Sequence, residues 1–244
     1  MEKNVAEIQR SLTAVPQKNA TSFRLVRRVW SKELKGMPGE TVIGLAKHLI
    51  RLGPWERLFA YEMIVHHRAA LQSLRPKDIT LLGRGMQNWG EVDSFACYVA
   101  GPAWRQHSIP DTLVQDWARS HNRWWKRAAL VSTVPLNNHA RGGTGDTLRT
   151  FKICRMLVCD RDDMVVKALS WALRELSKRD PSAVRVFLRR YEQVLPSRVN
   201  REVRNKLQTG LKNPGGLLTP RSSHKSDFNT RSRFFATNSP ACNR

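Results

Sequence analysis

The chain has 244 residues, 41% of them hydrophobic, which is enough for a folded protein with a substantial core. Its 42 Lys and Arg outnumber 20 Asp and Glu, giving a formal net charge of +22. This excess predicts a polyanionic partner, most often a nucleic acid; the alternative is a ribosome-associated or generally basic protein. No run approaches the roughly 20 apolar residues of a membrane span, and residues 1–18 lack the apolar segment of a signal peptide. We therefore expect a cytoplasmic protein without a membrane partner.

From the N-terminus onward, nearly every periodic segment is typical of an α-helix, because apolar residues recur every three to four positions. Asp111, Asp146 and Asp162 are expected as N-caps or first-turn acids. No alternating pattern bounded by hairpin turns indicates a strand. The predicted helices are Val5–Thr13, Thr21–Lys35, Thr41–Leu52, Trp55–Ser73, Pro76–Gly83, Glu91–Gly101, Asp111–Ser120, Arg123–Val134, Asp146–Val158, Asp162–Lys178, Ser182–Tyr191 and Val199–Leu211.

Short helices joined by short loops predict an all-α fold of stacked antiparallel helix pairs, a HEAT-like or armadillo-like α-solenoid. The expected unit is roughly 35–45 residues, and the alternative is an irregular helical bundle. We expect an N-terminal helix or arm over residues 1–20 and the repeat domain over 21–212. From Asn213 the composition changes to Gly, Ser, Thr, Asn and Arg, which predicts a disordered basic tail over 213–244.

Trp171 is the most informative residue of the predicted helix Asp162–Lys178. At 3.6 residues per turn it falls opposite the apolar stripe, among Lys167, Arg174 and Lys178. An indole among cations and turned away from the core suits a nucleic acid, which offers sugars, bases and phosphates together. The predicted core stripe consists of Val165, Ala168, Leu169, Ala172 and Leu176.

Trp89 and Asp93 lie four residues apart and share one face of a predicted helix, next to small residues that leave room for a ligand. A carboxylate repels phosphate, so its presence in a phosphate-binding surface indicates that it meets a cation. A glycosidic bond that breaks through an oxocarbenium-like state presents one. The alternative is that Asp93 caps a helix or pairs with a nearby arginine.

Arg127 flanks the apolar side of the helix that begins at Arg123, whereas Trp124 is expected to face the core. The planar guanidinium of Arg127 suits a phosphate group. The alternative is a solvated surface arginine.

Other signals do not indicate chemistry. The segment Arg141–Asp146 is Gly-rich but lacks the Lys-Ser/Thr of a phosphate-binding loop, and is expected to be a flexible connection. His66 and His67 lack a third ligand, so we expect no metal and no cofactor. Buried thiols are expected at Cys97 and Cys154. Core or repeat-packing tryptophans are expected at Trp55, Trp104 and Trp117.

Three motifs, in this order and at this spacing, resemble the AlkD-type DNA alkylation repair family of HEAT-like alkylpurine DNA glycosylases. They are Trp89-x-x-x-Asp93, Arg127-Ala-Ala and Trp171-x-x-Arg174-Glu175, and the resemblance covers roughly residues 20–212. It implies a C-shaped solenoid whose basic concave groove holds double-stranded DNA containing alkylated purines.

The same resemblance implies that Trp89, Trp171 and Asp93 contact the sugar and phosphate of the lesion as the catalytic residues. Arginines matching Arg127 and Arg174 would hold the DNA backbone. Lys167 and Lys178, which flank Trp171 in the sequence, are expected to bind the backbone as well.

The implied reaction is hydrolysis of the N-glycosidic bond of N3- or N7-alkylated purines, leaving an abasic site without the usual base flipping. The enzyme would be a monomer, monofunctional and free of cofactors, in the cytoplasm of a bacterium and associated with the nucleoid. One departure concerns the N-terminal helix, which in the family carries an aromatic residue near the lesion; between Ile8 and Leu12 this chain has none. The alternatives are a non-catalytic DNA-binding HEAT-repeat protein and a protein-binding scaffold.

Overall fold

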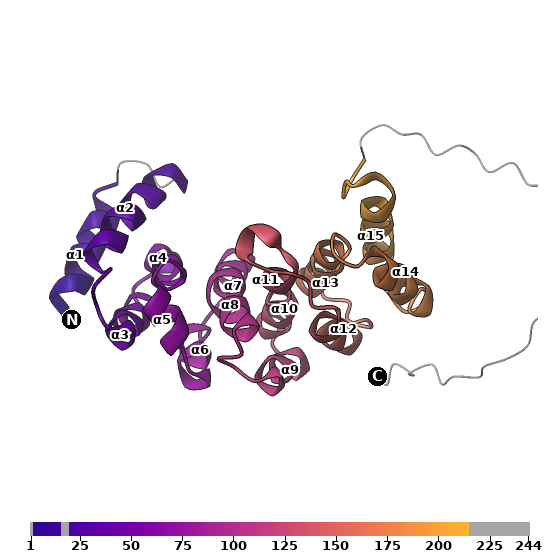
Figure 1. The fold of residues 1–244 in the computed structure, drawn as a ribbon, viewed down its shortest axis with the longest axis horizontal. Helices are drawn as coiled ribbons and strands as arrows, with labels where there is room; N and C mark the ends of the chain where they lie inside the picture. Colours follow the sequence, from indigo (N-terminus) through magenta and orange to yellow (C-terminus); the bar gives the residue numbers. More distant parts are fainter. Residues whose placement is uncertain (1, 16–19, 215–244) are drawn as a thin grey trace, which may run out of the picture.

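The computed structural model describes residues 2–15 and 20–214, and this part of the chain consists of helices and connections without a strand. Figure 1 shows the helices following one another along an arc whose two ends turn to the same side. The helices are α1 (Glu2–Thr13), α2 (Ala20–Glu33), α3 (Gly39–Leu49), α4 (Pro54–Val65), α5 (Arg68–Ser73), α6 (Pro76–Leu82), α7 (Trp89–Phe95), the π-helix η1 (Ala96–Ala100), α8 (Gly101–Arg105), α9 (Asp111–Arg119), α10 (Arg123–Val131), α11 (Val134–Asn137), the 3-10 helix η2 (His139–Arg141), α12 (Thr147–Met156), α13 (Asp163–Leu176), α14 (Pro181–Arg190) and α15 (Ser197–Thr209).

Each helix packs against helices that are near to it in the sequence. The main contacts join α3 to α4, α9 to α10, α10 to α13 and α13 to α15. The buried side chains therefore form a strip that runs along the array, as in a repeat protein in which each unit contacts only its neighbours. The predicted α-solenoid is confirmed.

The predicted N-terminal helix over residues 1–20 and the predicted tail over 213–244 can be compared with the structure separately. Helix α1 packs against α2, α3 and α4, and its Ile8 and Leu12 are buried in the common core. Of the predicted tail, residues 215–244 lie outside the described residues. Among the residues that are described, none of the helices combines the length and apolar character needed to cross a membrane.

The predicted helix caps agree with the structure. Carboxylate oxygens of Asp146 and Asp162 accept backbone N–H groups at the starts of α12 and α13, and Asp111 lies in the first turn of α9. Asp111 also accepts a hydrogen bond from the indole N–H of Trp104, which is buried as predicted. Cys97 and Cys154 are buried free thiols, and burial raises the pKa of Cys97 to about 12.

The prediction of one continuous helix over Trp55–Ser73 is wrong, because α4 ends at Val65 and α5 begins at Arg68. His67 is the N-cap of α5: its Nδ1 accepts the backbone N–H of Ala70 at 3.0 Å, and its Nε2 lies 3.0 Å from the carbonyl oxygen of Leu34. The imidazole therefore satisfies one backbone group at the helix start and one on the neighbouring repeat. Apolar periodicity alone does not reveal such a break.

The predicted helix Glu91–Gly101 is longer in the structure, running through α7, η1 and α8 from Trp89 to Arg105. Its middle is a π-helical segment, a feature that often interrupts α-helices at functional positions. The segment Arg141–Asp146, expected to be a flexible connection, begins at the last residue of the short helix η2, which follows α11. Asn137, which is buried, donates to Thr133 and Thr150 and accepts from the backbone of Asp146, so this connection is held in place.

Close packing of α3 against α5 depends on Gly39. A Cβ atom at this position would lie 2.6 Å from the carbonyl carbon of Ala69 and 2.8 Å from the backbone nitrogen of Ala70. We expect Gly39→Ala to lower the free energy of unfolding by about 1–3 kcal/mol, because two backbones must separate. Gly36→Ala is the matched control, since nothing lies within 4 Å of its added Cβ. Equal urea midpoints for the two variants would contradict this packing.

Candidate active site

An ion pair between Asp93 and Arg127 lies at the centre of the array. Asp93 is on α7 and Arg127 on α10, and these helices pack against each other. Nε of Arg127 donates to Oδ1 of Asp93 at 2.8 Å, and Nη2 donates to Oδ2 at 2.7 Å. Nη1 donates to the carbonyl oxygen of Met164 at 2.6 Å. One guanidinium group thus connects α7 and α10 with the start of α13.

This geometry decides two of the alternatives left open by the sequence. Asp93 pairs with an arginine, and Arg127 is not a solvated surface residue, since its side chain is only 7% exposed. A bidentate pair fixes the plane of the carboxylate as well as its position. The predicted phosphate contact of Arg127 stays a prediction, and in the free protein all three guanidinium nitrogens donate to protein oxygens.

Burial raises the pKa of Asp93 above its ordinary value, while the hydrogen bonds and the charge of Arg127 act in the opposite direction. The folded protein therefore holds this proton more tightly than the unfolded chain does. The resulting contribution to stability is present below the ordinary pKa of Asp and is lost as the pH rises through the higher pKa of the folded state. Arg127 limits this rise and favours the ionised carboxylate.

Trp89 is the first residue of α7, one turn before Asp93. The helix start is held by Asn88, whose side chain accepts the backbone N–H of Glu91 at 3.0 Å. Of the eight tryptophans, all within the described residues, Trp89 is the exposed one, at 61%. The indole ring of Trp89 is therefore open to contact from outside the protein.

Trp171 differs from the expectation that its ring turns away from the core. It is partly buried and packs against the core, although the predicted core stripe of α13 is buried throughout. The reason is that α13 contacts α10, α11, α12 and α15. These neighbours bury more faces of the helix than the one apolar face predicted from the sequence. Trp171 therefore lies at the edge of the buried surface.

Arg174 is oriented by a carboxylate from the next helix. Its Nε donates to Oγ of Ser170 at 3.2 Å and lies 3.9 Å from Oε2 of Glu202 on α15. Glu202 is buried and accepts the hydroxyl of Ser170 at 2.6 Å, while Lys212 approaches its other oxygen at 3.4 Å. Burial lowers the pKa of Arg174, and Glu202 opposes this shift.

Lys167 and Lys178 form ion pairs along α13 and its C-terminal end. Nζ of Lys167 lies 2.7 Å from Asp163, and Nζ of Lys178 lies 2.8 Å from Glu175. Both lysine side chains are nearly half exposed, but Asp163 is exposed whereas Glu175 is buried. The pair of Lys167 therefore contributes little to stability and can exchange partners. The sequence pattern indicates these cations but not the buried Glu202, which reaches Arg174 only because α15 packs against α13.

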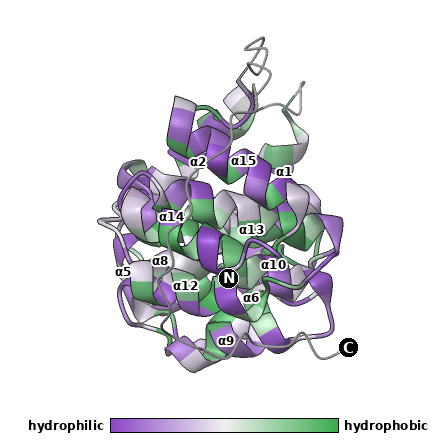
Figure 2. Cartoon of the chain, turned by 90° about the vertical axis from the view of Figure 1, so that its right-hand side faces the viewer, coloured by the Kyte–Doolittle hydropathy of each residue, from purple (hydrophilic) through white to green (hydrophobic). Residues whose placement is uncertain are grey.

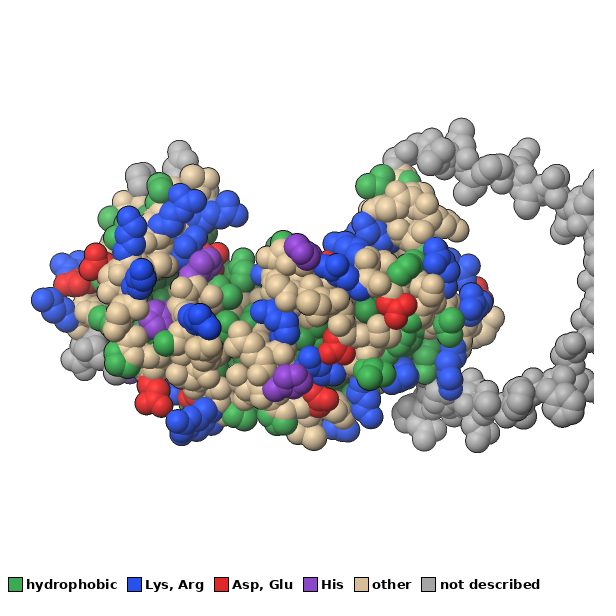
Figure 3. Space-filling view, viewed as in Figure 1, with side chains coloured by type: hydrophobic (Ala, Val, Ile, Leu, Met, Phe, Trp, Pro, Cys, Tyr) green, Lys and Arg blue, Asp and Glu red, His purple; other side chains and the backbone are tan. Residues whose placement is uncertain are grey.

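The surface is hollowed on the side to which both ends of the array turn. Figure 3 shows this hollow between the α2 end and the α15 end, with Lys and Arg side chains gathered over α2 and near α15. Arg24, Arg28 and Lys32 of α2 are exposed and succeed one another at four-residue intervals on one face of the helix.

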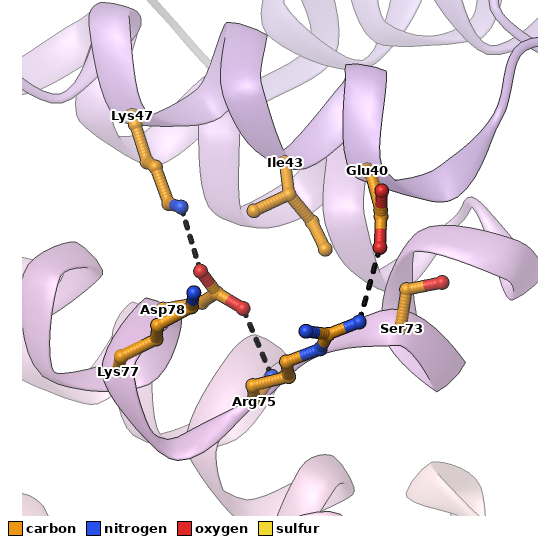
Figure 4. A pocket seen from close by; sticks show the side chains of 7 residues that line it. All are labelled: Glu40, Ile43, Lys47, Ser73, Arg75, Lys77 and Asp78. Carbon is orange, nitrogen blue, oxygen red and sulfur yellow. Dashed lines mark hydrogen bonds and ion pairs between the residues drawn. The ribbon is translucent and has the colours of Figure 1, made fainter.

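A charged pocket of about 250 Å³ lies elsewhere, between α3 and the start of α6 (Figure 4). Nζ of Lys47 lies 2.6 Å from Oδ1 of Asp78, and Arg75 lies 3.2 Å from Glu40. Oδ2 of Asp78 also accepts the backbone N–H of Arg75 at 3.0 Å. Because these charges are paired with one another, we interpret the pocket as a structural link between the two helices.

No group of three or more His, Cys, Asp or Glu side chains within residues 2–15 and 20–214 is arranged to hold a metal ion. The chemistry-bearing groups of the site are a carboxylate, indoles and cations on adjacent helices of an α-solenoid.

The sequence profile of a family described as DNA alkylation repair enzymes matches residues 18–207. This range is most of the chain, and the chain belongs to that family. A solved structure described as a predicted DNA alkylation repair enzyme from Enterococcus faecalis is similar in fold, with a TM-score of 0.64 at 17% identity over 85% of this chain and 94% of that one. No curated protein sequence matches the chain.

The Asp93–Arg127 pair is expected to matter for stability. Arg127→Met leaves a mostly buried carboxylate without its partner, and we expect a loss of about 3 kcal/mol in the free energy of unfolding at neutral pH. The loss is expected to shrink in acid, because Asp93 without Arg127 has a still higher pKa and protonates more readily. Urea unfolding at acidic and neutral pH measures both.

Arg123→Met, on the same helix, is the control for that experiment. Its guanidinium lies 3.4 Å from Asp162 and the Arg123 side chain is more than half exposed, so a change of under about 1 kcal/mol is expected. A similar loss for both variants, or one that does not depend on pH, would contradict the role given to Arg127.

Proposed function

We propose that this protein is a DNA glycosylase that hydrolyses the N-glycosidic bond of N3- or N7-alkylated purines in duplex DNA. The observation that carries the proposal is the Asp93 carboxylate, fixed by Arg127 one helical turn from the exposed Trp89. Membership in the DNA alkylation repair enzyme family supports a DNA substrate with alkyl damage. The net charge of +22 supports a nucleic-acid partner.

Duplex DNA is proposed to lie in the hollow between the two ends of the array. Lys167 exchanges its exposed partner Asp163 for a phosphate, whereas Lys178 adds a phosphate contact while its partner Glu175 stays buried. Both phosphate contacts release counterions from the DNA. Arg174, oriented by Ser170 and Glu202, directs its remaining N–H groups toward the backbone. Trp89 lies on α7 and Trp171 on α13, and both of these helices contact α10. The two rings are proposed to offer their faces to the sugar of the lesion.

The chemistry follows from the charge of the lesion. An N3- or N7-alkylated purine is already cationic, so the bond from C1′ to the base breaks with its electron pair leaving on the base. The sugar becomes an oxocarbenium-like cation, which the ionised Asp93 stabilises, and water adds at C1′ and loses a proton. Such electrostatic stabilisation is worth about 3–4 kcal/mol, by analogy with single oxyanion-hole groups. The products are the free alkylpurine and an abasic site.

Arg127 has a positioning role in this proposal. Its two hydrogen bonds leave lone pairs on both oxygens of Asp93 for a water molecule, while they hold the carboxylate plane. Its charge and hydrogen bonds lower the pKa of Asp93 and so favour the ionised form, against the larger effect of burial. A leaving group that is already activated requires no pocket to receive a flipped base. We further propose a monofunctional monomer that acts in the cytoplasm at the nucleoid.

Release of 7-methylguanine and 3-methyladenine from methylated duplex DNA, without heating, tests the proposal. We expect Asp93→Asn to lower the release rate by about 10²–10³-fold while DNA affinity is retained, since the amide keeps the shape but lacks the charge. Asp116→Asn, which changes an exposed acid on α9, is the control and is expected to act like wild type. Binding without release by wild type would favour the non-catalytic DNA-binding alternative, and normal release by Asp93→Asn would refute the mechanism.

The pH dependence of base release is a separate prediction. Arg127→Lys removes one of the two hydrogen bonds to Asp93, so the pKa of Asp93 is expected to rise further. Because the ionised form is the active one, the acidic limb of the pH–rate profile moves to higher pH in this variant. Single-turnover rates over a pH series measure the shift, and an unmoved acidic limb would argue that Asp93 does not act as the anion.

A further inference from the structure

A second cationic site lies at the C-terminal end of the array, between α14 and α15. The cleft has a volume of about 200 Å³, and Figure 2 views the molecule from this end. Its lining comprises Arg185, Leu188, Arg189, Arg204, Leu207 and Gln208. None of these residues belongs to the site around Asp93.

The cleft has positive charge that the protein does not neutralise. Arg185 and Arg189 are one helical turn apart on α14, both are exposed, and within the described residues neither forms an ion pair with a carboxylate. Arg204 approaches from α15 and pairs with Glu192 at the surface. Like charges four residues apart on a helix repel each other. An anion between the arginines removes this repulsion.

The shape and floor of the cleft limit the anion. Leu188 is buried and Leu207 partly buried, so the base of the cleft is apolar beneath the guanidinium groups. Planar guanidinium groups match the oxygens of a phosphate, and an apolar floor suits the carbon face of a sugar. The volume is below the roughly 300–1,000 Å³ of sites that enclose a drug-sized ligand, so a whole nucleotide does not fit inside.

We propose that this cleft binds a phosphodiester of the DNA backbone, a contact additional to those in the hollow. The proposal rests on the proposed function only in taking duplex DNA as the ligand. It assigns Arg185 and Arg189 as phosphate-binding residues and Leu188 with Leu207 as the surface for the adjoining sugar. The site anchors undamaged DNA beside the lesion and has no part in the bond cleavage.

The salt dependence of binding tests this assignment. An undamaged duplex with 5′-hydroxyl ends is titrated at several salt concentrations, so that terminal phosphates play no part. For the double variant Arg185→Gln, Arg189→Gln we expect the slope of log K against log salt to fall in magnitude by about 0.9, the contribution of the one phosphate contact that is lost.

A control with the same change in charge is Arg190→Gln, Arg201→Gln. Both arginines are exposed on the same two helices, and neither lines the cleft. We expect its slope to stay close to that of wild type. An unchanged slope for the cleft variant, or an equal decrease in both variants, would overturn the proposal. All four positions are exposed, so circular dichroism is expected to show unaltered folding.

Inorganic pyrophosphate tests the cleft without DNA. We expect pyrophosphate to raise the melting temperature of wild type and of the control more than that of the cleft variant. Equal stabilisation of all three proteins would contradict a built phosphate site. Because neither experiment needs base release, a cleft that binds phosphate in a protein that releases no base would refute the glycosylase and leave this inference standing.

Discussion

The guanidinium group of Arg127 is the contact on which the centre of the structure depends. It donates to both oxygens of Asp93 and to the carbonyl of Met164, and so connects three helices of successive repeats. A buried pair of this kind offers little net stability compared with apolar packing, but losing one partner is costly. Its value here is geometric: it fixes one carboxylate at a surface where a cationic sugar is proposed to form. Its charge also favours the ionised form of that carboxylate, against the effect of burial.

Ion pairs with carboxylates also orient the cationic side chains of the proposed site in the free protein. The cations proposed to meet the backbone each have a carboxylate partner in the free protein. For Lys167 the partner is the exposed Asp163, so phosphate competes easily. For Lys178 the partner is Glu175, whose carboxylate is buried and stays in place. For Arg174 the partner is the buried Glu202, which orients the side chain and stays in place. Exchangeable and permanent pairs thus separate DNA binding from the positioning of the site.

Much of the fold was accessible from the sequence, because helix periodicity and N-caps are local. The break at His67 was not, since the imidazole serves a backbone group of the preceding repeat. Nor was the pairing of Asp93 with Arg127, which depends on how α7 meets α10. The spacing of polar residues in the sequence could have indicated such contacts, because four polar pairs join neighbouring repeats at separations of 31 to 34 residues. They are Lys47–Asp78, Asp93–Arg127, Lys126–Asp160 and Ser170–Glu202.

The most direct test of the account is a double-mutant cycle read in base release. The rate of 7-methylguanine release is measured for wild type, Asp93→Asn, Arg127→Met and the double variant, at saturating protein. If Arg127 acts through Asp93, the double variant is as slow as Asp93→Asn alone, because residues that work as a unit are not additive. If the two losses multiply, Arg127 acts on the DNA independently, and the carboxylate held by its arginine is not the centre of the site.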